Sequence, residues 1–472
     1  PGASPDLIEI LYDDGITPAV DDDGILRFAS PAGEMLESPL ICWQVIGGEE
    51  VLRTAEYLIE EGSVRIAVEE YDPGYELVID PELLYSTYLG GDAHDYGSAL
   101  APDGAGGVWI AGGTSSTNFP VTPDGYHGSH GGSDDAFVSR FSSSGALLYS
   151  TYLGGSYSDY GSALAPDGAG GVWVAGNTRS SNFPVTDDAY QMSYGGGSYD
   201  YGDAFVSRFS SSGALLYSTY LGGDSRDQGN TLAPDGDGDV WITGFTESTD
   251  FPVTDNAYLG SKPSNKYEKD AFVSCFSSDG VLLYSTYLGG SFKDVGSALA
   301  PDGAGGVWVA GYTSSNNFPI TADAYQRQRL FPGLGYSTDA FVSRFSSTGD
   351  LIYSTFLGAE DWSSEGYALA PDGAGGVWVA GGTGAYGFPV TDDAYQESKS
   401  GSSYVYAAFV SRFSSTGALL YSTYLGGSST DEGYALAPDG AGGVWVAGRT
   451  FSTDFPVTDD AYQMSHGGGD GY

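Results

Sequence analysis

The chain has few cysteines, few positive charges and no long apolar stretch. Its 472 residues include two cysteines, Cys42 and Cys275, which leave open either one disulfide or two separate buried thiols. No apolar run approaches the roughly 20 residues that a membrane helix needs, so membrane insertion is not expected. The chain begins at Pro1 without a signal peptide, and we therefore expect a processed protein.

Positive charge is scarce, since 17 Lys and Arg stand against 62 Asp and Glu and give a formal net charge of −45 at pH 7. A field of this sign repels phosphate backbones and anionic lipid surfaces. Nucleic acid and membranes are therefore not expected partners. The same charge attracts divalent cations and favours solubility.

Catalytic signatures are also missing. No Gly-x-Ser-x-Gly elbow, paired-cysteine motif or phosphate-binding loop stands in a suitable context. His127 and His130 have the spacing of metal ligands, but they stand in a Gly/Ser loop where a solvated pair is the simpler interpretation. Acids are abundant enough that glycoside hydrolysis is not excluded by residue type, yet no single acid breaks the repeat pattern described below. We expect that the protein is not an enzyme.

Glycine, tyrosine and internal repetition are what the chain has in abundance. Three phrases recur in order with a period of 64 to 69 residues: "LLYSTYLGG", "ALAPDGAGGVWVAG" and "DAFVSRF". A fixed period of this kind indicates a repeat architecture. The first phrase contains Tyr85, Tyr149, Tyr217, Tyr284, Tyr353 and Tyr421, and the second contains Trp109, Trp173, Trp241, Trp308, Trp378 and Trp445.

Each period predicts four short antiparallel strands. "GSALAPD" and "VWVAG" flank the turn "DGAGG", "DAFVSRF" and "LLYSTYLGG" flank the turn "SSSGA", and a variable insert containing "FPVTDDAYQ" joins the two pairs. Asp-Gly and Gly-Gly supply the positive φ of tight hairpins. No helical periodicity occurs, so the pattern predicts an all-β protein, a β-propeller with one four-stranded blade per period. Each tryptophan is expected to pack between neighbouring blades.

Five complete blades are expected over residues 97–155, 161–223, 229–290, 296–359 and 366–427, and two strands of a sixth at 434–448. Residues 75–91, "YELVIDPELLYSTYLGG", are predicted to supply the two outer strands of that last blade, which closes a six-bladed ring and removes exposed strand edges. An alternative is that they complete the last blade of a neighbouring molecule. Residues 1–74 are expected to form a separate small β-rich domain.

These phrases, together with "NFPVTDDAYQ", resemble the SBBP β-propeller repeat family of secreted bacterial and archaeal proteins, and the resemblance covers residues 75–472. Residues 1–82 resemble the later part of the β-domain that often precedes such repeats. The resemblance implies an extracellular or surface-attached propeller. It carries no established catalytic motif.

Acids recur at two positions of the repeat, one before the first strand and one at the start of the third. Both are replaced in the fifth repeat, by Ser364 and Ala407, which indicates that the two acids of a repeat face each other. Facing carboxylates need a proton or a cation between them, and Ca²⁺ is the natural cation outside cells. The alternative is that each acid caps its own turn. The predicted Ca²⁺ ligands are Asp95, Asp135, Asp159, Asp203, Asp227, Asp270, Asp294 and Asp339.

Three functions remain compatible with the sequence. The first is an extracellular structural protein that assembles with itself into a lattice, tube or filament with calcium support. The second is an adhesion or binding propeller that recognises a glycan or a surface protein through its variable inserts, because variable loops on a repetitive scaffold are where binding usually resides. The third, a polysaccharide-acting enzyme, has the least support.

Overall fold

The computed structural model describes residues 85–196, 202–330, 337–402, 404–458, 461 and 463–467, and before residue 85 nine strands with residues 54, 69 and 72. These residues contain strands and turns and no helix, as the all-β prediction requires. Consequently, the described chain has no helix of the length and apolar character needed to cross a membrane. Two compact units form: residues 1–89 with 102–109 and 140–148, and the remaining residues.

The strands before residue 85 make three small sheets. Their orders are β1-β8-β7, β2-β3-β4 and β6-β5-β9, with antiparallel pairing throughout. The strands are β1 (Glu9–Leu11), β2 (Thr17–Val20), β3 (Leu26–Ser30), β4 (Gly33–Glu37), β5 (Leu40–Ile46), β6 (Glu49–Arg53), β7 (Ala55–Glu60), β8 (Ser63–Val68) and β9 (Leu77–Pro81).

The pairing of β9 corrects one prediction. Residues 75–80 were expected to form an outer strand of the last blade, but β9 pairs with β5, with Ile79 opposite Cys42 and Leu77 opposite Gln44. The apolar strand β5 offers an edge about 35 residues away along the chain, whereas the last blade lies more than 350 residues away. The nearer partner closes the smaller loop and so has the smaller entropic cost.

From residue 95 onward, the predicted blades appear as five four-stranded antiparallel sheets in simple sequential order. The first three blades are β10 (Asp95–Pro102), β11 (Val108–Thr114), β12 (Asp135–Phe141) and β13 (Leu147–Leu153); β14 (Asp159–Pro166), β15 (Val172–Thr178), β16 (Asp203–Phe209) and β17 (Leu215–Leu221); and β18 (Asp227–Pro234), β19 (Val240–Thr246), β20 (Asp270–Phe276) and β21 (Leu282–Leu288).

The last two of the five blades follow the same plan, and a sheet of two strands comes after them. These elements are β22 (Asp294–Pro301), β23 (Val307–Thr313), β24 (Asp339–Phe345) and β25 (Leu351–Leu357); β26 (Ser364–Pro371), β27 (Val377–Thr383), β28 (Ala407–Phe413) and β29 (Leu419–Leu425); and β30 (Asp431–Pro438) with β31 (Val444–Thr450).

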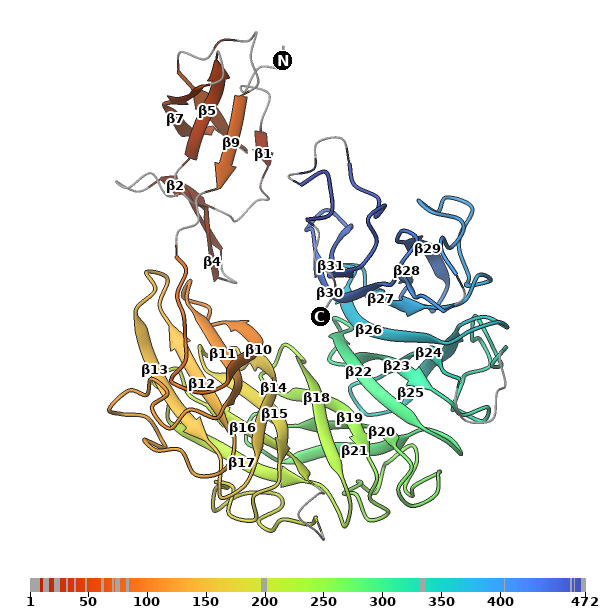
Figure 1. Cartoon of the computed structure of the whole chain (residues 1–472). Coiled ribbons are helices and arrows are strands. Elements are labelled where there is room, and N and C mark those ends of the chain that lie inside the picture. Colours follow the sequence, from red (N-terminus) through yellow and green to blue (C-terminus); the bar gives the residue numbers. More distant parts are fainter. Residues whose placement is uncertain are drawn as a thin grey trace. The chain divides into compact units, whose positions relative to one another are not determined.

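The first strands of successive blades are neighbours and form the inner layer of the propeller. β14 contacts β18, β18 contacts β22, and β22 contacts β26 (Figure 1). Burial alternates along β14 and β26, so one face of each inner strand packs against the next blade while the other is partly exposed. The inserts and blade-to-blade connections leave the sheets at one end, called here the insert face, and the short hairpin turns leave at the other, the turn face.

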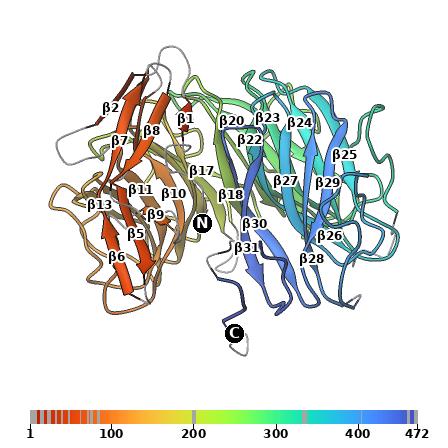
Figure 2. The same cartoon turned by 90° about the horizontal axis from the view of Figure 1, so that it is seen from above.

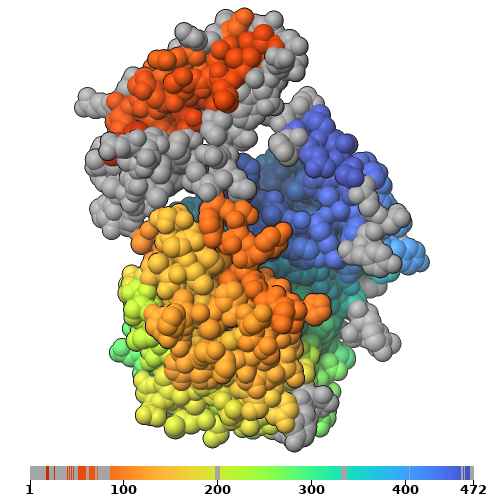
Figure 3. Space-filling model, turned by 60° about the vertical axis from the view of Figure 1, so that its left-hand side comes forward, coloured from red at the N-terminus to blue at the C-terminus, as the bar shows by residue number. Residues whose placement is uncertain are grey.

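Tryptophan packs between blades, as the sequence predicted. The five tryptophans of the complete blades are at most 8% exposed, and the Trp173 indole N–H donates to Gly238 O of the next blade at 3.2 Å. Trp241 and Trp308 make the same hydrogen bond one blade further on. Alanines and the tryptophan of one blade meet valine, isoleucine and phenylalanine side chains of the next. Figure 3 shows the first two blades, orange and yellow, as one packed surface.

In four blades, an arginine on the third strand forms an ion pair with the aspartate of the hairpin turn at the turn face. Arg344 donates through Nε and Nη2 to Asp302 Oδ2 at 3.0 and 2.8 Å, and its guanidinium lies 5.5 Å from the Trp308 ring. Equivalent pairs join Arg140 to Asp103, Arg208 to Asp167 and Arg412 to Asp372. In the third blade, Cys275 replaces the arginine and no such pair forms.

The sheet of β30 and β31 contains two strands, which lie side by side in Figure 2. Neither pairs with a third strand in the described chain, and Trp445 on β31 is 72% exposed.

In the other unit, the Tyr85 ring lies 6.4 Å from Phe141 and against Gly145. Tyr149 makes the same contact with the following blade, so Tyr85 contacts the first blade as a fourth-strand tyrosine does.

A glycine in the turn between the third and fourth strands gives a test of this packing. Gly213 has φ +85°, and a Cβ there would lie 2.1 Å from the buried Tyr149 ring. Gly213→Ala should lower the thermal unfolding midpoint, because backbone strain of about 1–2 kcal/mol adds to overpacking of about 1–3 kcal/mol.

Gly168→Ala is the matched control for that substitution. Gly168 has φ +74° with no atom within 4 Å of its Cβ position, so this variant carries the backbone strain alone. Equal midpoints for the two variants would contradict the role assigned to the tyrosine contact.

Candidate functional site

The acids singled out from the sequence lie at the insert face and come together as pairs that join neighbouring blades. A Cβ on Gly154 would lie 2.7 Å from Asp135 Oδ1 of the first blade and 2.8 Å from Asp159 Oδ2 of the second. The Asp159 backbone N–H donates to Asp134 O at 2.9 Å and fixes this approach. Two further pairs are Asp203 with Asp227 around Gly222, and Asp270 with Asp294 around Gly289.

The prediction that the two acids of one repeat face each other is therefore wrong. Within the second blade, Asp159 lies opposite Thr178, and Thr178 lies opposite Asp203. Strand β15 thus separates the two acids, because an antiparallel blade always places its second strand between its first and third.

The two replacements in the fifth repeat fall in different pairs for the same reason. The Ser364 backbone N–H donates to Thr338 O, next to Asp339, at 2.8 Å. The Asp431 backbone N–H donates to Tyr406 O, next to Ala407, also at 2.8 Å. Two pairs have each lost one acid, so the replacements do not record the joint loss of one cation site.

The remaining predicted ligand, Asp95, caps the connection before the first blade. Its carboxylate accepts the Gly91 backbone N–H at 2.7 Å and the Ser116 hydroxyl at 2.9 Å. Asp159 has the same contacts with Gly155 and Ser180. The Asp159 side chain thus both caps its turn and faces Asp135.

Burial makes the pairs unfavourable as two full charges. Burial raises the pKa of Asp159 to about 7, hydrogen bonds from Thr178, Gly155 and Ser180 oppose the shift, and the charge of Asp135 adds to it. We therefore expect Asp159 to be partly protonated near neutral pH, and a proton shared by the two carboxyl groups would let them lie side by side.

The same effect recurs along the propeller. Burial raises the pKa of Asp203 to about 7 and that of Asp294 to about 8, and it raises the pKa of Asp227 well above the usual range of an aspartate. The oxygens that face the partner acid, Asp135 Oδ1 and Asp270 Oδ1, have no hydrogen-bond partner in the described chain. A shared proton would satisfy them.

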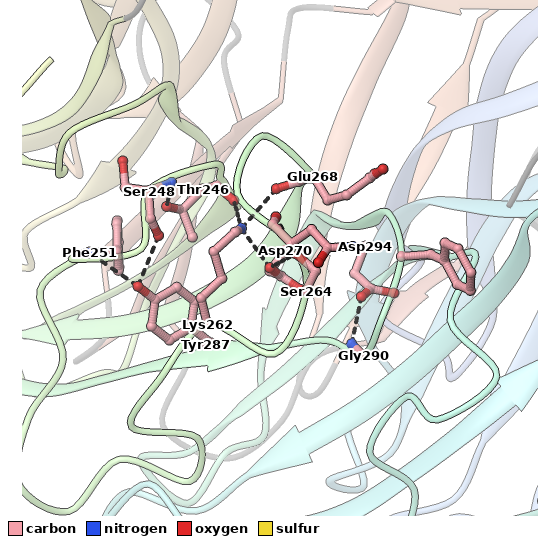
Figure 4. Close-up of polar contacts among 12 residues, drawn as sticks. Thr246, Ser248, Phe251, Lys262, Ser264, Glu268, Asp270, Tyr287, Gly290 and Asp294 are labelled. Atoms are coloured by element: carbon pink, nitrogen blue, oxygen red, sulfur yellow. Dashed lines mark hydrogen bonds and ion pairs between the residues drawn. The ribbon is translucent and has the colours of Figure 1, made fainter. Parts of the chain in front are cut away.

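In the third blade, a lysine of the insert enters the pair (Figure 4). Lys262 Nζ donates to Asp270 Oδ2 at 2.6 Å and to the carbonyl oxygens of Thr246 at 3.0 Å and Glu268 at 2.8 Å. The Gly290 backbone N–H donates to Asp294 Oδ2 at 2.7 Å. The buried charge of Asp270 is thus balanced from within the chain.

Other inserts bring a side chain to the same place. Arg329 Nε lies 3.8 Å from Asp339 Oδ2, and His130 lies beside Asp135 with its Nε2 3.3 Å from Thr114 O. No group of three or more His, Cys, Asp or Glu side chains in the described residues could hold a metal ion. The carboxylates of one pair supply fewer oxygens than the roughly six to eight that Ca²⁺ takes, and calcium at these acids stays a prediction.

Two smaller predictions and one acidic turn can also be placed. Cys42 and Cys275 are both buried and free, which corresponds to separate thiols. His127 stacks on Tyr126 at 4.8 Å between ring centroids, and in the described residues it belongs to no group of three or more side chains that could hold a metal ion. The run "DGDGD" at 235–239 is the hairpin turn of the third blade, closed by the Asp235 backbone N–H and Asp239 O at 3.1 Å.

Sequence reasoning missed a second set of residues, which lies around the insert-face ends of the inner strands. Near-identical blades differ here at framework positions, outside the variable inserts. The third and fourth blades place Arg226, Lys269 and Lys293 beside Phe245 and Tyr312, a group called here the basic sector. At the corresponding positions, the other repeats hold His94, Ser158, Ser363 or Thr430 before the first strand and Asp134, Gly202, Thr338 or Tyr406 before the third.

The fifth blade and β30–β31 carry an acidic counterpart, called here the acidic sector. Tyr367 donates to Glu365 Oε2 at 3.0 Å, and Tyr434 donates to Glu432 Oε2 at 2.7 Å. The two tyrosine rings lie 5.4 Å apart, and Arg449 Nε donates to Glu432 Oε2 at 2.6 Å. Charge and aromatic character therefore change from blade to blade around the inner strands.

A signal for this region exists in the sequence. When the repeats are aligned, the residue before each first-strand acid reads His94, Ser158, Arg226, Lys293, Ser363 and Thr430. Variation between repeats at a position whose neighbours are nearly identical in every repeat indicates that packing does not determine the residue there. The inserts vary more strongly in length and sequence, so the variation at these framework positions was missed.

Comparison with known proteins identifies the repeats. The model of the SBBP β-propeller repeat matches residues 148–184 and 283–319. The chain carries SBBP β-propeller repeats. The model of a domain of unknown function, DUF7948, matches residues 1–82.

Among curated proteins, the regulatory protein FlaEY of Caulobacter vibrioides is 29% identical over 149 residues. The match covers 32% of this chain and 15% of that protein, so only a small part of the relative is represented. A crystal structure of a protein of unknown function from Bacteroides thetaiotaomicron is 13% identical, with a TM-score of 0.21, over 78% of this chain and 96% of that one.

Proposed function

We propose that the protein is an extracellular, non-enzymatic binding propeller whose recognition surface is the insert face around the inner strands. One observation carries the proposal: side chains that differ between otherwise near-identical blades gather there as a basic sector and an acidic sector. Residues free of packing demands and concentrated at one end of a rigid scaffold are typical of binding sites. An extracellular glycan or a surface protein is the proposed partner.

The proposal is tested by array binding of the full chain to extracellular glycans and surface proteins. The matched variant combines Glu365→Tyr, Tyr367→Ser, Glu432→Tyr and Tyr434→Ser, which are the residues of the second blade, Tyr160 and Ser162, at the same positions. We expect a ligand for the natural chain that this variant loses or binds at least about tenfold more weakly. A ligand bound equally by both would contradict a role for the acidic sector.

Self-assembly into a lattice, tube or filament is the second candidate, and the exposed Trp445 face favours it. The tryptophans at equivalent positions are buried by a following blade, whereas Trp445 offers the same surface to another molecule. Negative-stain microscopy decides between the two functions. Ordered polymers that a Trp445→Ser variant no longer forms would favour assembly, and monomers of both would remove it.

As the alternative to assembly through Trp445, we propose that residues 85–91 supply the fourth strand of the last blade of a six-bladed ring. The contact of Tyr85 with Phe141 supports this role, because a fourth-strand tyrosine makes that contact elsewhere. The third strand of that blade then has to come from a segment other than β9. Hydrogen exchange that protects the backbone amides of residues 85–89 would support the proposal, and rapid exchange there would oppose it.

A further inference from the structure

Positive charge is concentrated at one point of a strongly acidic protein. Of the 17 Lys and Arg in the chain, three lie in the basic sector and come from separate segments. Arg226 and Lys293 each precede the first-strand acid of a blade, and Lys269 ends the insert of the third blade. The Asp294 backbone N–H donates to Lys269 O at 2.7 Å and brings the two lysines together.

Aromatic rings receive these charges in place of acids. Lys269 Nζ lies 3.8 Å and the Arg226 guanidinium 5.2 Å from the centroid of Phe245, a ring that is 4% exposed. Lys293 Nζ lies 4.7 Å from the Tyr312 ring. Within the part of the chain that the structure describes, none of the three cations forms an ion pair. Cation–π contacts stabilise each charge but do not neutralise it.

The cluster is electrostatically unfavourable as it stands. The pKa of Lys269 is lowered to about 8, first by burial and then by the charges of Arg226 and Lys293, while the charge of Glu247 opposes the shift. Three half-buried like charges without a counterion raise the energy of the folded chain. An anion that enters between them would relieve this repulsion.

The fold does not require these cations. The second and fifth blades form the same sheets with Ser158 and Ser363 at the positions of Arg226 and Lys293. The fourth blade has Thr338 at the position of Lys269. A packing role therefore does not account for the cluster, whereas the binding of a ligand would.

We propose that the basic sector is a binding site for a small ligand that carries an oxyanion group, such as the carboxylate of an acidic sugar or a sulfate. This inference rests on the proposed binding function and names the chemistry of one part of its surface. Lys and Arg donors at half-buried positions bind carboxylate and sulfate oxygens through charge-assisted hydrogen bonds. The net charge of −45 repels a long polyanion from a distance, so the ligand is short.

Isothermal titration of the full chain with sodium glucuronate, sodium sulfate and neutral glucose tests the site. We expect saturable binding of at least one oxyanion and none of glucose. The double variant Arg226→Ser and Lys293→Ser, and separately Lys269→Thr, should weaken binding at least about tenfold, since each removes a charged contact. Stronger binding of glucuronate than of sulfate would assign the site to an acidic sugar, and the reverse order would assign it to a free oxyanion.

A charge-matched control separates the site from general attraction. Lys266 is exposed and paired with Asp224 at 2.6 Å, so Lys266→Ser should leave affinity unchanged. Binding by the natural chain should also weaken from pH 7 to pH 9, as Lys269 loses its proton. This pH dependence should disappear in Lys269→Thr.

Two results would overturn the inference: no saturable binding of either oxyanion, or equal weakening by Lys266→Ser. If the array ligand described above is still bound in that case, the binding function stands and only the assignment of the basic sector fails. If neither the array nor the titration finds a ligand, both proposals fail together.

Discussion

Arg344→Met should lower the stability of the propeller by roughly 3–5 kcal/mol, because it leaves a buried carboxylate without its cation. The side chain of Asp302 is 2% exposed and receives two hydrogen bonds from Arg344. The backbone N–H groups of Ala304 and Gly306 remain as its donors. Arg344 also donates to Ser415 O of the next blade at 2.7 Å, so contact between two blades is lost as well. The thermal unfolding midpoint of the full chain measures the effect.

The third blade provides the converse variant. Cys275 stands where the other complete blades have arginine. Burial raises the pKa of its thiol, and the charges of Asp239 and Asp235 add to the shift. Cys275→Arg places a cation into this negative field, so the midpoint should rise or stay level. A fall as large as that of Arg344→Met would show that the position tolerates no long side chain in this blade and would contradict the electrostatic explanation.

Asp294→Asn should flatten the pH dependence of stability. The pKa of Asp294 is about 8 in the folded protein because burial disfavours its charge, whereas an unfolded aspartate has a pKa near 3.9. The stability that the raised pKa of Asp294 contributes is complete below the pKa of the unfolded state and is lost as the pH rises through the pKa of the folded state. Between pH 4 and 8, the free energy of unfolding should therefore fall by up to about 1.4 kcal/mol per pH unit for this group. Asparagine, always neutral, removes that slope.

The controls for Asp294→Asn distinguish a proton from calcium. Asp255→Asn makes the same charge change on an exposed side chain and should leave the slope intact. Melting curves with CaCl₂ and with EDTA complete the test. Calcium at the pair would be established if EDTA lowers the unfolding midpoint of the natural chain and Asp294→Asn is strongly destabilising at pH 7. That result would contradict the shared proton.

Much of the propeller follows from the sequence because each blade repeats one local pattern. Strand order, turn positions and the buried tryptophans all depend on contacts within a period or between adjacent periods. The assignment of residues 75–80 failed because an alternating apolar strand is compatible with any free edge. Which edge it takes depends on β5, whose own pairing no repeat specifies.

The acid positions were predictable, but their partners were not. Recurrence identified Asp135 and Asp159 as special, while the connection between blades decides that they face each other. The basic sector was missed for another reason. Its cations replace small residues within the repeated frame, so they are visible only when each blade is compared with the others position by position.

The pairing of acids across blades has a consequence for how such a gene can change length. Each pair takes one half from one period and the other half from the next. Loss of residues 227–293 would bring the blade of Asp203 against the strand that begins with Asp294, and the seam would hold the same two carboxyl groups. Unequal crossing-over between neighbouring copies can thus add or remove whole blades, and a junction between two copies that carry both acids keeps its pair.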